Sequence, residues 1–435
     1  MEHIVIIGNG IAGTTAARHI RKQADYRISI ISAETEYFFS RTALMYVYMG
    51  HLRWQDLQPY ESHFWSKNRL ELLQGSVVNI VPAEQSVVLS DGRHVSYDKL
   101  ILATGSKTNT FGWEGLELPQ VTGLVSRQDL EKLEEIAPDN IHCPRAVIVG
   151  GGLIGVELAE MLCTRGIAVT MLVREKSFWN NVLPGGESQM ISRHITAHGV
   201  CLRHETQLGK ILSDGTGRVR AVRTTYGEEI PCSMVGITTG VIPNIGFLEG
   251  SGIETDSGIL VNRMLETNAR GVYAIGDCAQ QREPIGNRPP VEAVWYTGRM
   301  MGEAVARTIC GKPTPYHPGH WFNSAKFFDI EYQTYGWVFP EDKCKPFESH
   351  FHWIHKDDDK CITMSYHREK GTFLGINTFG MRMKHEVINS WLTDEKSADY
   401  VMQHLEEANF DPEFYTSYHQ EILQAYRHHL KSAVS

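Results

Sequence analysis

Two short apolar runs, at residues 4–7 and 146–149, are each followed at once by a glycine-rich stretch. Apolar runs of this length bounded by glycine are typical of strands buried on both faces of a parallel sheet. Each glycine string then predicts a tight turn from the strand into a helix. The glycines are, in chain order, Gly8, Gly10, Gly13, Gly150, Gly152 and Gly155.

The spacing of these glycines has a physical reason. The first of each string permits the tight turn, the second lets the backbone approach a pyrophosphate, and the third lets helix and strand pack closely. The first helical turn offers free N–H groups and a positive dipole end to phosphates. Two such motifs predict two dinucleotides on one chain, which indicates electron transfer between them. The residues that begin the two helices are Ile11, Ala12, Leu153 and Ile154.

Around the first motif the pattern predicts a strand, a helix and a second strand, at residues 4–7, about 12–22 and 27–32. The second strand delivers Glu34, 21 residues after Gly13. A carboxylate at this place can accept hydrogen bonds from the hydroxyls of an adenosine ribose. We therefore predict that Glu34 binds ribose.

The remaining pattern predicts a second such unit and further strands, then a change of architecture. Prolines within 313–318 mark a linker. Beyond it, strand-like runs are followed by two amphipathic helices, at about 384–407 and 411–431. The expected strands lie within 69–106 and 144–175, near 199–205, 218–224 and 231–238, and at 331–338, 349–355, 360–367 and 372–378.

The composition narrows the class of protein. A chain of 435 residues exceeds one ordinary domain, and its length suggests about three. Its net charge of −9 argues against general affinity for nucleic acid, which needs a basic patch. No apolar run approaches the length of a membrane span, and the first strand follows His3 directly, which leaves no room for a signal peptide. We therefore expect a soluble cytoplasmic protein.

The cysteines and histidines predict no metal site. The eight cysteines form no C-x-x-C pair and lack the spacing of zinc or iron–sulfur ligands, so reduced, mostly buried thiols are expected. His350, His352 and His355 invite a metal site, but only His350 and His352 share a strand face. No carboxylate cluster or cysteine completes the set, and a solvated strand face is favoured.

Four motifs in this order resemble those of the FAD-dependent pyridine nucleotide-disulfide oxidoreductase superfamily. The resemblance covers residues 1–315. It implies an α/β fold with two Rossmann-like dinucleotide-binding domains, an NAD(P) domain being inserted into an FAD domain, and a C-terminal α+β domain near the flavin. The implied segments are 1–111 and 242–317 for FAD, 112–241 for NAD(P), and 318–435 for the C-terminal domain. The motifs are the first glycine string with Glu34, then Ala103, Thr104 and Gly105, then the second glycine string, then Gly276 and Asp277.

The resemblance also implies how the flavin is held. Asp277 would bind its ribityl or pyrophosphate part. A helix that begins at about Glu292 would point its N-terminus at the flavin and stabilise the anionic reduced ring. Trp295 and Thr297 would lie near that ring. Gly240, in a segment that echoes the Ala-Thr-Gly strand end, is expected to contact a cofactor as well.

The residues beside the flavin indicate a subgroup. Disulfide reductases of this superfamily carry cysteines in the region that corresponds to residues 37–45. This chain has Ser40 there, and a hydroxyl cannot form a mixed disulfide, so a dithiol relay is not expected. The segment instead resembles the Arg-Pro-x-Leu-Ser-Lys stretch of rubredoxin and ferredoxin reductases, the nitrite reductase large subunit and apoptosis-inducing-factor relatives, which Arg41 and Leu44 match.

Tyr46 occupies the position of the family's lysine in this stretch. In the family that lysine pairs with a glutamate near flavin N5, and Glu157 corresponds to the glutamate. The resemblance therefore implies that Arg41, Tyr46 and Glu157 lie at the reaction site. Without the lysine, three states of Glu157 stay open: a neutral side chain, one paired with Arg41, or one hydrogen-bonded to Tyr46.

The nucleotide preference depends on the end of the second unit's second strand. Relatives that prefer NADH usually place a carboxylate where this chain has Val173, and relatives that prefer NADPH often place an arginine where it has Arg174. An arginine can bind a 2′-phosphate bidentately. The sequence therefore favours NADPH over NADH, although Glu175 could also bind an unphosphorylated ribose.

These expectations combine into an FAD-dependent NAD(P)H oxidoreductase that passes hydride from nicotinamide to FAD and electrons to an external acceptor. The expected acceptor is a small iron–sulfur or rubredoxin-type protein, or else a quinone or other small-molecule oxidant. Two alternatives stay open: an NAD(P)H oxidase, and a redox-sensing flavoprotein like the apoptosis-inducing-factor relatives, with little turnover. A homodimer is possible, since residues 321–337 are rich in aromatic side chains that suit either a core or an interface.

Overall fold

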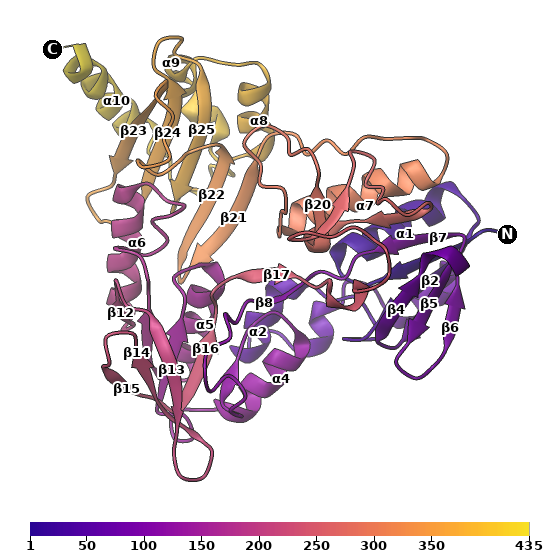
Figure 1. Cartoon of the computed structure of the whole chain (residues 1–435). Coiled ribbons are helices and arrows are strands. Elements are labelled where there is room, and N and C mark those ends of the chain that lie inside the picture. Colours follow the sequence, from indigo (N-terminus) through magenta and orange to yellow (C-terminus); the bar gives the residue numbers. More distant parts are fainter. Residues whose placement is uncertain (435) are drawn as a thin grey trace. The chain divides into compact units, whose positions relative to one another are not determined.

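The computed structural model describes residues 1–434 of the chain (Figure 1). Internal contacts divide them into two compact units of three segments each. The first unit comprises Met1–Phe111, Thr122–Pro138 and Gly240–Pro318. The second comprises Gly112–Val121, Asp139–Thr239 and the described residues from 319 onward. The finer division into an FAD domain, an NAD(P) domain and a C-terminal domain stays a prediction.

The first unit is built on a five-stranded sheet in the order β19-β7-β1-β2-β3, and every neighbouring pair in it is parallel. The central strand β1 is the first apolar run, and its Ile4, Val5 and Ile6 are completely buried. A parallel sheet needs apolar residues on both faces of its strands, which is why the run shows no alternation. The strands are β1 (His3–Ile7), β2 (Arg27–Ser32), β3 (Leu70–Gln74), β7 (Lys99–Leu102) and β19 (Val272–Ala274).

Two helices of the first unit, α1 (Ile11–Gln23) and α7 (Trp295–Ile309), pack against each other very closely. Glycine in α7 permits this approach. A Cβ added at Gly302 would lie 2.6 Å from the carbonyl oxygen of Ala12. The contact therefore fixes the start of α7 relative to the glycine turn that begins α1.

Smaller elements complete the first unit. The helices α2 and α3 follow β2, and α4 follows the segment that returns from the second unit. A three-stranded antiparallel sheet and two strand pairs make up the rest. The elements are α2 (Leu44–Tyr48), α3 (Ser62–Lys67), α4 (Arg127–Ile136), β4 (Val77–Val81), β5 (Ser86–Leu89), β6 (His94–Ser96), β8 (Ser106–Thr108), β17 (Val241–Pro243), β18 (Ile259–Val261) and β20 (Ala279–Gln281).

The second unit repeats the parallel sheet, in the order β12-β11-β10-β16-β9. Its central strand β10 is the second apolar run, which leads through the second glycine string into α5. The elements are β9 (Val121–Thr122), β10 (Arg145–Val149), α5 (Leu153–Thr164), β11 (Ala168–Leu172), α6 (Gly185–Ala197), β12 (Cys201–Arg203), β13 (Leu208–Ser213), β14 (Val219–Thr224), β15 (Glu229–Pro231) and β16 (Met234–Ile237).

The C-terminal part of the second unit is an antiparallel sheet, in the order β21-β22-β25-β24-β23, with helices α8, α9 and α10 gathered against it (Figure 1). One face packs on these helices through a core that includes Tyr335, Ile376 and Trp391. The mixed α/β fold predicted from the sequence is confirmed. The elements are β21 (Phe322–Phe327), β22 (Ile330–Gly336), β23 (Glu348–Ile354), β24 (Cys361–His367), β25 (Phe373–Phe379), α8 (His385–Thr393), α9 (Ala398–Gln403) and α10 (His419–Val434).

The other face of this sheet carries a polar row across all five strands. The cross-strand register pairs each member with the next, and Glu187 of α6 lies on the row. Its Oε2 accepts a hydrogen bond of 2.9 Å from Nδ2 of Asn377, and the carboxyl is fully buried. Burial raises the pKa of Glu187 to about 8, against the hydrogen bonds from Thr363 and Asn377. The row consists of Asn323, Thr334, Asn377, Thr363 and His352.

The raised pKa of Glu187 predicts how stability depends on pH. The unfolded chain loses this proton at a lower pH than the folded chain, so Glu187 lowers the free energy of unfolding as pH rises from about 4.5 to about 8. We expect Glu187→Gln to remove this loss and to stabilise the protein above about pH 8, by an amount on the order of a few kcal/mol. Urea unfolding on both sides of that window measures the difference, and the exposed Glu369→Gln serves as the control. Equal pH profiles for wild type and Glu187→Gln would contradict the expectation.

Three local predictions need correction. The helix predicted at 384–407 is interrupted after α8, because Glu395 adopts a positive φ of 49° and Ser397 caps a new helix with its hydroxyl. The helix predicted at 411–431 begins only at His419, after Asp411 with φ 39°. The helix expected from about Glu292 begins at Trp295.

The histidines of the C-terminal sheet also differ from expectation. His350 and His352 share a strand face, as predicted, and His352 is exposed. The prediction of a solvated strand face is wrong for His350, which is half-buried beside Cys344, and for His355, which is buried.

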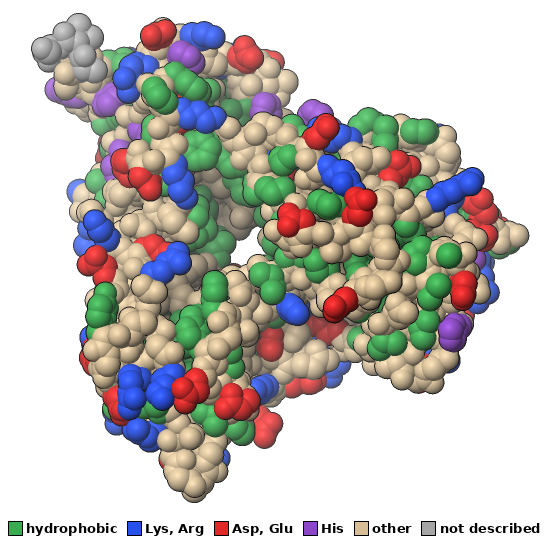
Figure 2. Space-filling view, viewed as in Figure 1, with side chains coloured by type: hydrophobic (Ala, Val, Ile, Leu, Met, Phe, Trp, Pro, Cys, Tyr) green, Lys and Arg blue, Asp and Glu red, His purple; other side chains and the backbone are tan. Residues whose placement is uncertain are grey.

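No helix among the described residues is long and apolar enough to cross a membrane. Basic and acidic side chains are mixed over the face of the molecule seen in Figure 2.

Candidate functional site

In the first glycine turn, packing requires glycine at two positions but not at the third. A Cβ at Gly8 would lie 2.0 Å from the carbonyl oxygen of Ala103, and one at Gly13 would lie 2.0 Å from that of Gly8. Gly8 also has a φ of 108°. A Cβ at Gly10, by contrast, would meet no protein atom within 4 Å. The chain itself therefore gives no packing reason for glycine at position 10, whereas the approach of a pyrophosphate does.

The second turn shows the same division. A Cβ at Gly150 would lie 2.4 Å from the carbonyl oxygen of Thr238, and one at Gly155 would lie 2.6 Å from that of Gly150. A Cβ at Gly152 would meet nothing within 4 Å. Gly10 and Gly152 are also the N-caps of α1 and α5, so the open positions lie where the free helical N–H groups are. Leu153 and Ile154 form the first turn of α5, as predicted. Both turns fit a dinucleotide phosphate.

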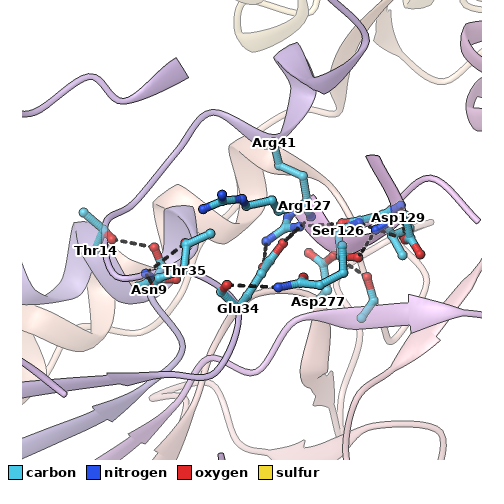
Figure 3. A network of polar contacts seen from close by, with 12 residues as sticks. Asn9, Thr14, Glu34, Thr35, Arg41, Ser126, Arg127, Asp129 and Asp277 are labelled. Carbon is cyan, nitrogen blue, oxygen red and sulfur yellow. Dashed lines mark hydrogen bonds and ion pairs between the residues drawn. The ribbon is translucent and has the colours of Figure 1, made fainter. Parts of the chain in front are cut away.

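A buried asparagine holds the first turn in place. Asn9 is 5% exposed, and its Nδ2 donates a hydrogen bond of 2.8 Å to the carbonyl oxygen of Thr35. The Thr14 hydroxyl donates to the carbonyl oxygen of Asn9 at 2.9 Å (Figure 3). These bonds join the glycine turn to the residue that follows Glu34. Sequence reasoning missed this role, because Asn9 occupies a position that the glycine pattern leaves undefined.

Glu34 is hydrogen-bonded to the side chain of Arg41 and to the backbone of Arg127 beside this turn. Its carboxylate forms a bidentate ion pair with Arg41, with oxygen–nitrogen distances of 2.5 and 2.8 Å. The backbone N–H of Arg127, at the start of α4, donates to Glu34 Oε1 at 2.9 Å (Figure 3). The network orients the carboxylate predicted to bind ribose. Arg127 is a site residue that the sequence did not indicate, since it lies 93 positions from Glu34.

Asp277 lies at the same edge of the first sheet. Its carboxylate accepts a hydrogen bond of 2.9 Å from the Ser106 hydroxyl. Burial raises the pKa of Asp277, against the effects of Ser106 and the positive charge of Arg41. Gly276 precedes it with φ 72°, and a Cβ there would lie 3.0 Å from Cβ of Ala12. Gly276 therefore lies against the first turn of α1.

These residues meet because the strands that deliver them are neighbours. Strands β1, β7 and β19 are adjacent and parallel, so their carboxyl ends share one edge of the sheet. Ligands of open α/β sheets bind outside that edge. The residues that follow these three strands are Gly8 and Gly10, then Ala103, Thr104 and Gly105, then Gly276 and Asp277.

Three residues predicted to lie near the flavin make contacts within the chain, one in the loop before α7 and two in the first turn of α7. Glu292 is 4% exposed and forms a buried ion pair with Arg288, while burial raises its pKa. The Thr297 hydroxyl donates to the carbonyl oxygen of Val294 at 2.9 Å. Trp295 is half-buried at the start of α7, with its ring centroid 6.1 Å from that of Phe38. Their roles toward a flavin stay predictions.

Two further predicted residues of the first unit lie outside regular strands. Gly240 has a φ of 95°, and its carbonyl oxygen accepts a hydrogen bond of 3.0 Å from the backbone N–H of Asn109. Tyr46 lies in α2, half-buried, with its ring stacked on His51 at a centroid distance of 6.1 Å.

Glu157 belongs to a small charged cluster on α5. Glu160 lies one helical turn further on. Lys326 of β21 forms an ion pair with Glu160, in which Nζ lies 2.5 Å from Oε1. Burial raises the pKa of Glu157 to about 7, the negative charge of Glu160 adds to the rise, and Lys326 opposes it. Glu157 therefore changes its charge near neutral pH. Lys326 and Glu160 are residues that the sequence did not indicate.

The end of β11 presents one exposed arginine. Arg174 is 68% exposed in its side chain and pairs with Glu175 at 2.8 Å. Val173 is fully buried, and a Cβ at Gly151 would lie 2.8 Å from its Cγ1. An apolar side chain at 173 therefore packs under the second glycine turn, and the cation at 174 is accessible to a ligand.

The eight cysteines of the described chain are all free. None lies within residues 37–45. Cys278, beside Asp277, is completely buried, and burial raises the pKa of its thiol. A buried thiol with a raised pKa is a poor nucleophile, because the thiolate is the reactive form.

Comparison with known proteins agrees with this geometry. Residues 2–302 match the family model described as pyridine nucleotide-disulphide oxidoreductase. A 5,5′-dehydrodivanillate O-demethylase ferredoxin reductase subunit from Sphingobium sp. is 31% identical over 346 residues, which cover 78% of this chain and 82% of that protein. A benzene 1,2-dioxygenase system ferredoxin–NAD(+) reductase subunit from Pseudomonas putida is 29% identical, over 74% of this chain and 78% of that protein.

A solved structure extends the likeness to the C-terminal sheet. The ferredoxin reductase for the CYP199A2 system from Rhodopseudomonas palustris has a TM-score of 0.80 and 22% identity, and the match covers 98% of this chain and 100% of that one. At this identity the likeness shows a shared fold.

Proposed function

Since this chain belongs to the pyridine nucleotide-disulphide oxidoreductase family, as a flavin-dependent NAD(P)H oxidoreductase, we propose that it passes electrons through FAD to a small iron–sulfur or rubredoxin-type protein. The observation that carries the proposal is the lack of a cysteine within residues 37–45, where disulfide reductases of the superfamily carry theirs. Ser40 lies in the region where those reductases have a cysteine, and the thiol of Cys278 is buried with a raised pKa. Electrons that cannot reduce an internal disulfide must leave to an external acceptor. Two relatives named as ferredoxin reductase components support this class of acceptor.

The first unit fits FAD. The free N–H groups of α1 and the open side of Gly10 would bind its pyrophosphate. Glu34, oriented by Arg41 and Arg127, would accept hydrogen bonds from the adenosine ribose. Asp277 would accept one from a hydroxyl of the cofactor. Bound flavin supplies the chemistry that converts a hydride into single electrons.

The second unit fits the nicotinamide nucleotide. The start of α5 and the open side of Gly152 would bind its pyrophosphate, and Arg174 would bind a 2′-phosphate. Glu157 would contact the nicotinamide end of the nucleotide, from which the hydride would be transferred. Its charge there depends on Lys326 and Glu160.

Arg174→Ala is expected to weaken NADPH binding about 10- to 100-fold, because a bond between two charged groups is lost. NADH binding should change little. Titration of each nucleotide into the oxidised protein measures both dissociation constants. Lys176→Ala, two residues on and also exposed, is the matched control. An equal loss of affinity for both nucleotides would mean that Arg174 supports the loop instead of the phosphate.

An acceptor assay tests the proposal. The protein is reduced anaerobically and then mixed with a ferredoxin, a rubredoxin, a quinone or oxygen. Faster reoxidation by one of the two small proteins than by quinone or oxygen supports it. Full turnover with air alone would instead indicate an NAD(P)H oxidase. A long-lived reduced complex that changes sedimentation and reduces no acceptor would indicate a redox-sensing protein.

A further inference from the structure

One histidine of α6, the histidine that caps this helix and one aspartate of the C-terminal sheet lie close together in the second unit. His194 and His198 are four positions apart and lie on one face of the helix, with ring centroids 4.4 Å apart. Asp329 lies in the tight turn between β21 and β22. Its Oδ1 is 2.6 Å from Nε2 of His194 and 3.6 Å from Nε2 of His198.

One hydrogen bond of His198 indicates which of its two ring nitrogens can ligate a metal ion. Nδ1 of His198 lies 3.0 Å from the carbonyl oxygen of His194, which can only accept. Nδ1 therefore carries the proton, and in a neutral ring Nε2 presents its lone pair. That nitrogen lies 3.6 Å from Oδ1 of Asp329, so two atoms that can ligate a metal ion lie side by side.

The hydrogen bond from Nδ1 of His198 to a backbone carbonyl oxygen is of the kind that metal-ligating histidines make. Their second ring nitrogen almost always donates to a carbonyl or carboxylate, which fixes the tautomer and the ring orientation. Phe328 adds a second restraint. Its ring stacks on His198 at 4.4 Å, and it is held with φ 55° at 6% exposure. The ring of His198 is thus oriented before any ion binds.

We propose that His194, His198 and Asp329 form a binding site for a divalent transition-metal ion of the zinc class. Two imidazoles and one carboxylate, with water as a fourth ligand, match the donors that such ions prefer. The three donor atoms lie within 4.8 Å of one another. Tetrahedral coordination at about 2.1 Å separates donors by about 3.4 Å, so the contact of 2.6 Å between His194 and Asp329 has to widen, whereas the 3.6 Å between His198 and Asp329 is already close to that separation. Asp329 is 75% exposed and can make this small movement.

Two other groups of donors in the described chain lack this combination. In the group of Cys344, Glu348 and His350, a Glu348 oxygen already accepts from the backbone of Lys345, and burial raises the pKa of the Cys344 thiol. In the group of His355, Asp357 and Asp359, Asp359 forms an ion pair of 2.5 Å with Lys360.

The ion would join α6 to the turn of the C-terminal sheet. Both elements belong to the second unit (Figure 1). Because only the folded chain brings the three donors together, bound metal is expected to stabilise this junction.

The test uses flavin-loaded protein freed of metal by a chelator. Zn²⁺ is titrated by calorimetry, Co²⁺ by its visible absorption, and the melting temperature is measured with and without Zn²⁺. We expect one Zn²⁺ site per chain, a tetrahedral Co²⁺ spectrum and a raised melting temperature. His198→Gln and Asp329→Asn should each weaken Zn²⁺ binding by about 100-fold or more and abolish the temperature shift, because each removes a ligand.

The control variant is His142→Ala. His142 is exposed and pairs with Asp139 at 2.8 Å, which matches the exposed histidine–aspartate contact without a second imidazole. It should leave the site intact. Zn²⁺ binding that survives both His198→Gln and Asp329→Asn, or no binding by the wild type, would overturn the proposal. A retained flavin spectrum in each variant shows that it folds.

Discussion

A protein in which Gly10 is replaced by valine is expected to fold and to contain no flavin. A side chain at this position meets no protein atom within 4 Å, and the φ of −67° is accessible to any residue. The isopropyl group would instead occupy the approach of the pyrophosphate to the N-terminus of α1. The loss of an N-cap glycine costs only about 1 kcal/mol of stability. The ratio of flavin absorbance to protein absorbance after purification measures the effect.

Gly13→Ala separates a binding effect from a packing effect. Its Cβ would lie 2.0 Å from the carbonyl oxygen of Gly8 and 3.1 Å from Ile6 Cγ2. We expect it to destabilise even the flavin-free protein, by about 1–3 kcal/mol. Stability must be compared in flavin-free samples, because a bound ligand itself stabilises the folded state. A Gly10→Val protein that is purified yellow and fully loaded would contradict the role of the first turn.

The second large effect concerns the charge of Glu157. Lys326→Met is expected to raise its pKa further above about 7, because the opposing positive charge is lost. Glu160→Gln is expected to lower it, because a neighbouring negative charge is lost. We expect shifts of up to about one unit in opposite directions. Stopped-flow measurement of flavin bleaching by NADPH, as a function of pH, reports this pKa if Glu157 contacts the nicotinamide.

The opposite directions of the two expected pKa shifts of Glu157 distinguish an electrostatic effect from structural damage. Both variants break the same ion pair between Lys326 and Glu160. A merely structural role would therefore move both pH profiles in the same direction or lower both rates without a shift. The charged groups that act on Glu157 are Glu160 of its own helix and Lys326 of β21. Glu157→Gln should remove this inflection altogether, and an inflection that persists would assign it to another group.

The sequence predicted the parts of the site that depend on local spacing. Gly8 and Gly13 are required by contacts inside the turn, and an alternation of strand, turn and helix identifies such a turn without a structure. The sequence indicated Asp277 but could not predict its hydrogen-bond partner Ser106. Ser106 and Asp277 are 171 positions apart and meet only because β7 and β19 are neighbours in the sheet.

The same reason explains the polar groups of the second unit. Lys326 reaches Glu160 from 166 positions away, and Asn377 reaches Glu187 from 190. Each partner looks like an ordinary strand residue, since its hydrophobicity gives no sign of the helix that packs on it. The break between α8 and α9 was missed because it depends on a single left-handed residue, Glu395, and not on proline or glycine.

An anaerobic titration of the purified protein with NADPH and, separately, NADH tests whether one chain binds both dinucleotides. We expect bound flavin whose visible absorption bleaches rapidly on stoichiometric addition of a nucleotide, faster with NADPH. This result requires both dinucleotide sites on one chain and hydride transfer between them. Purified protein without flavin, or with flavin that neither nucleotide reduces, would contradict the proposed electron transfer through FAD.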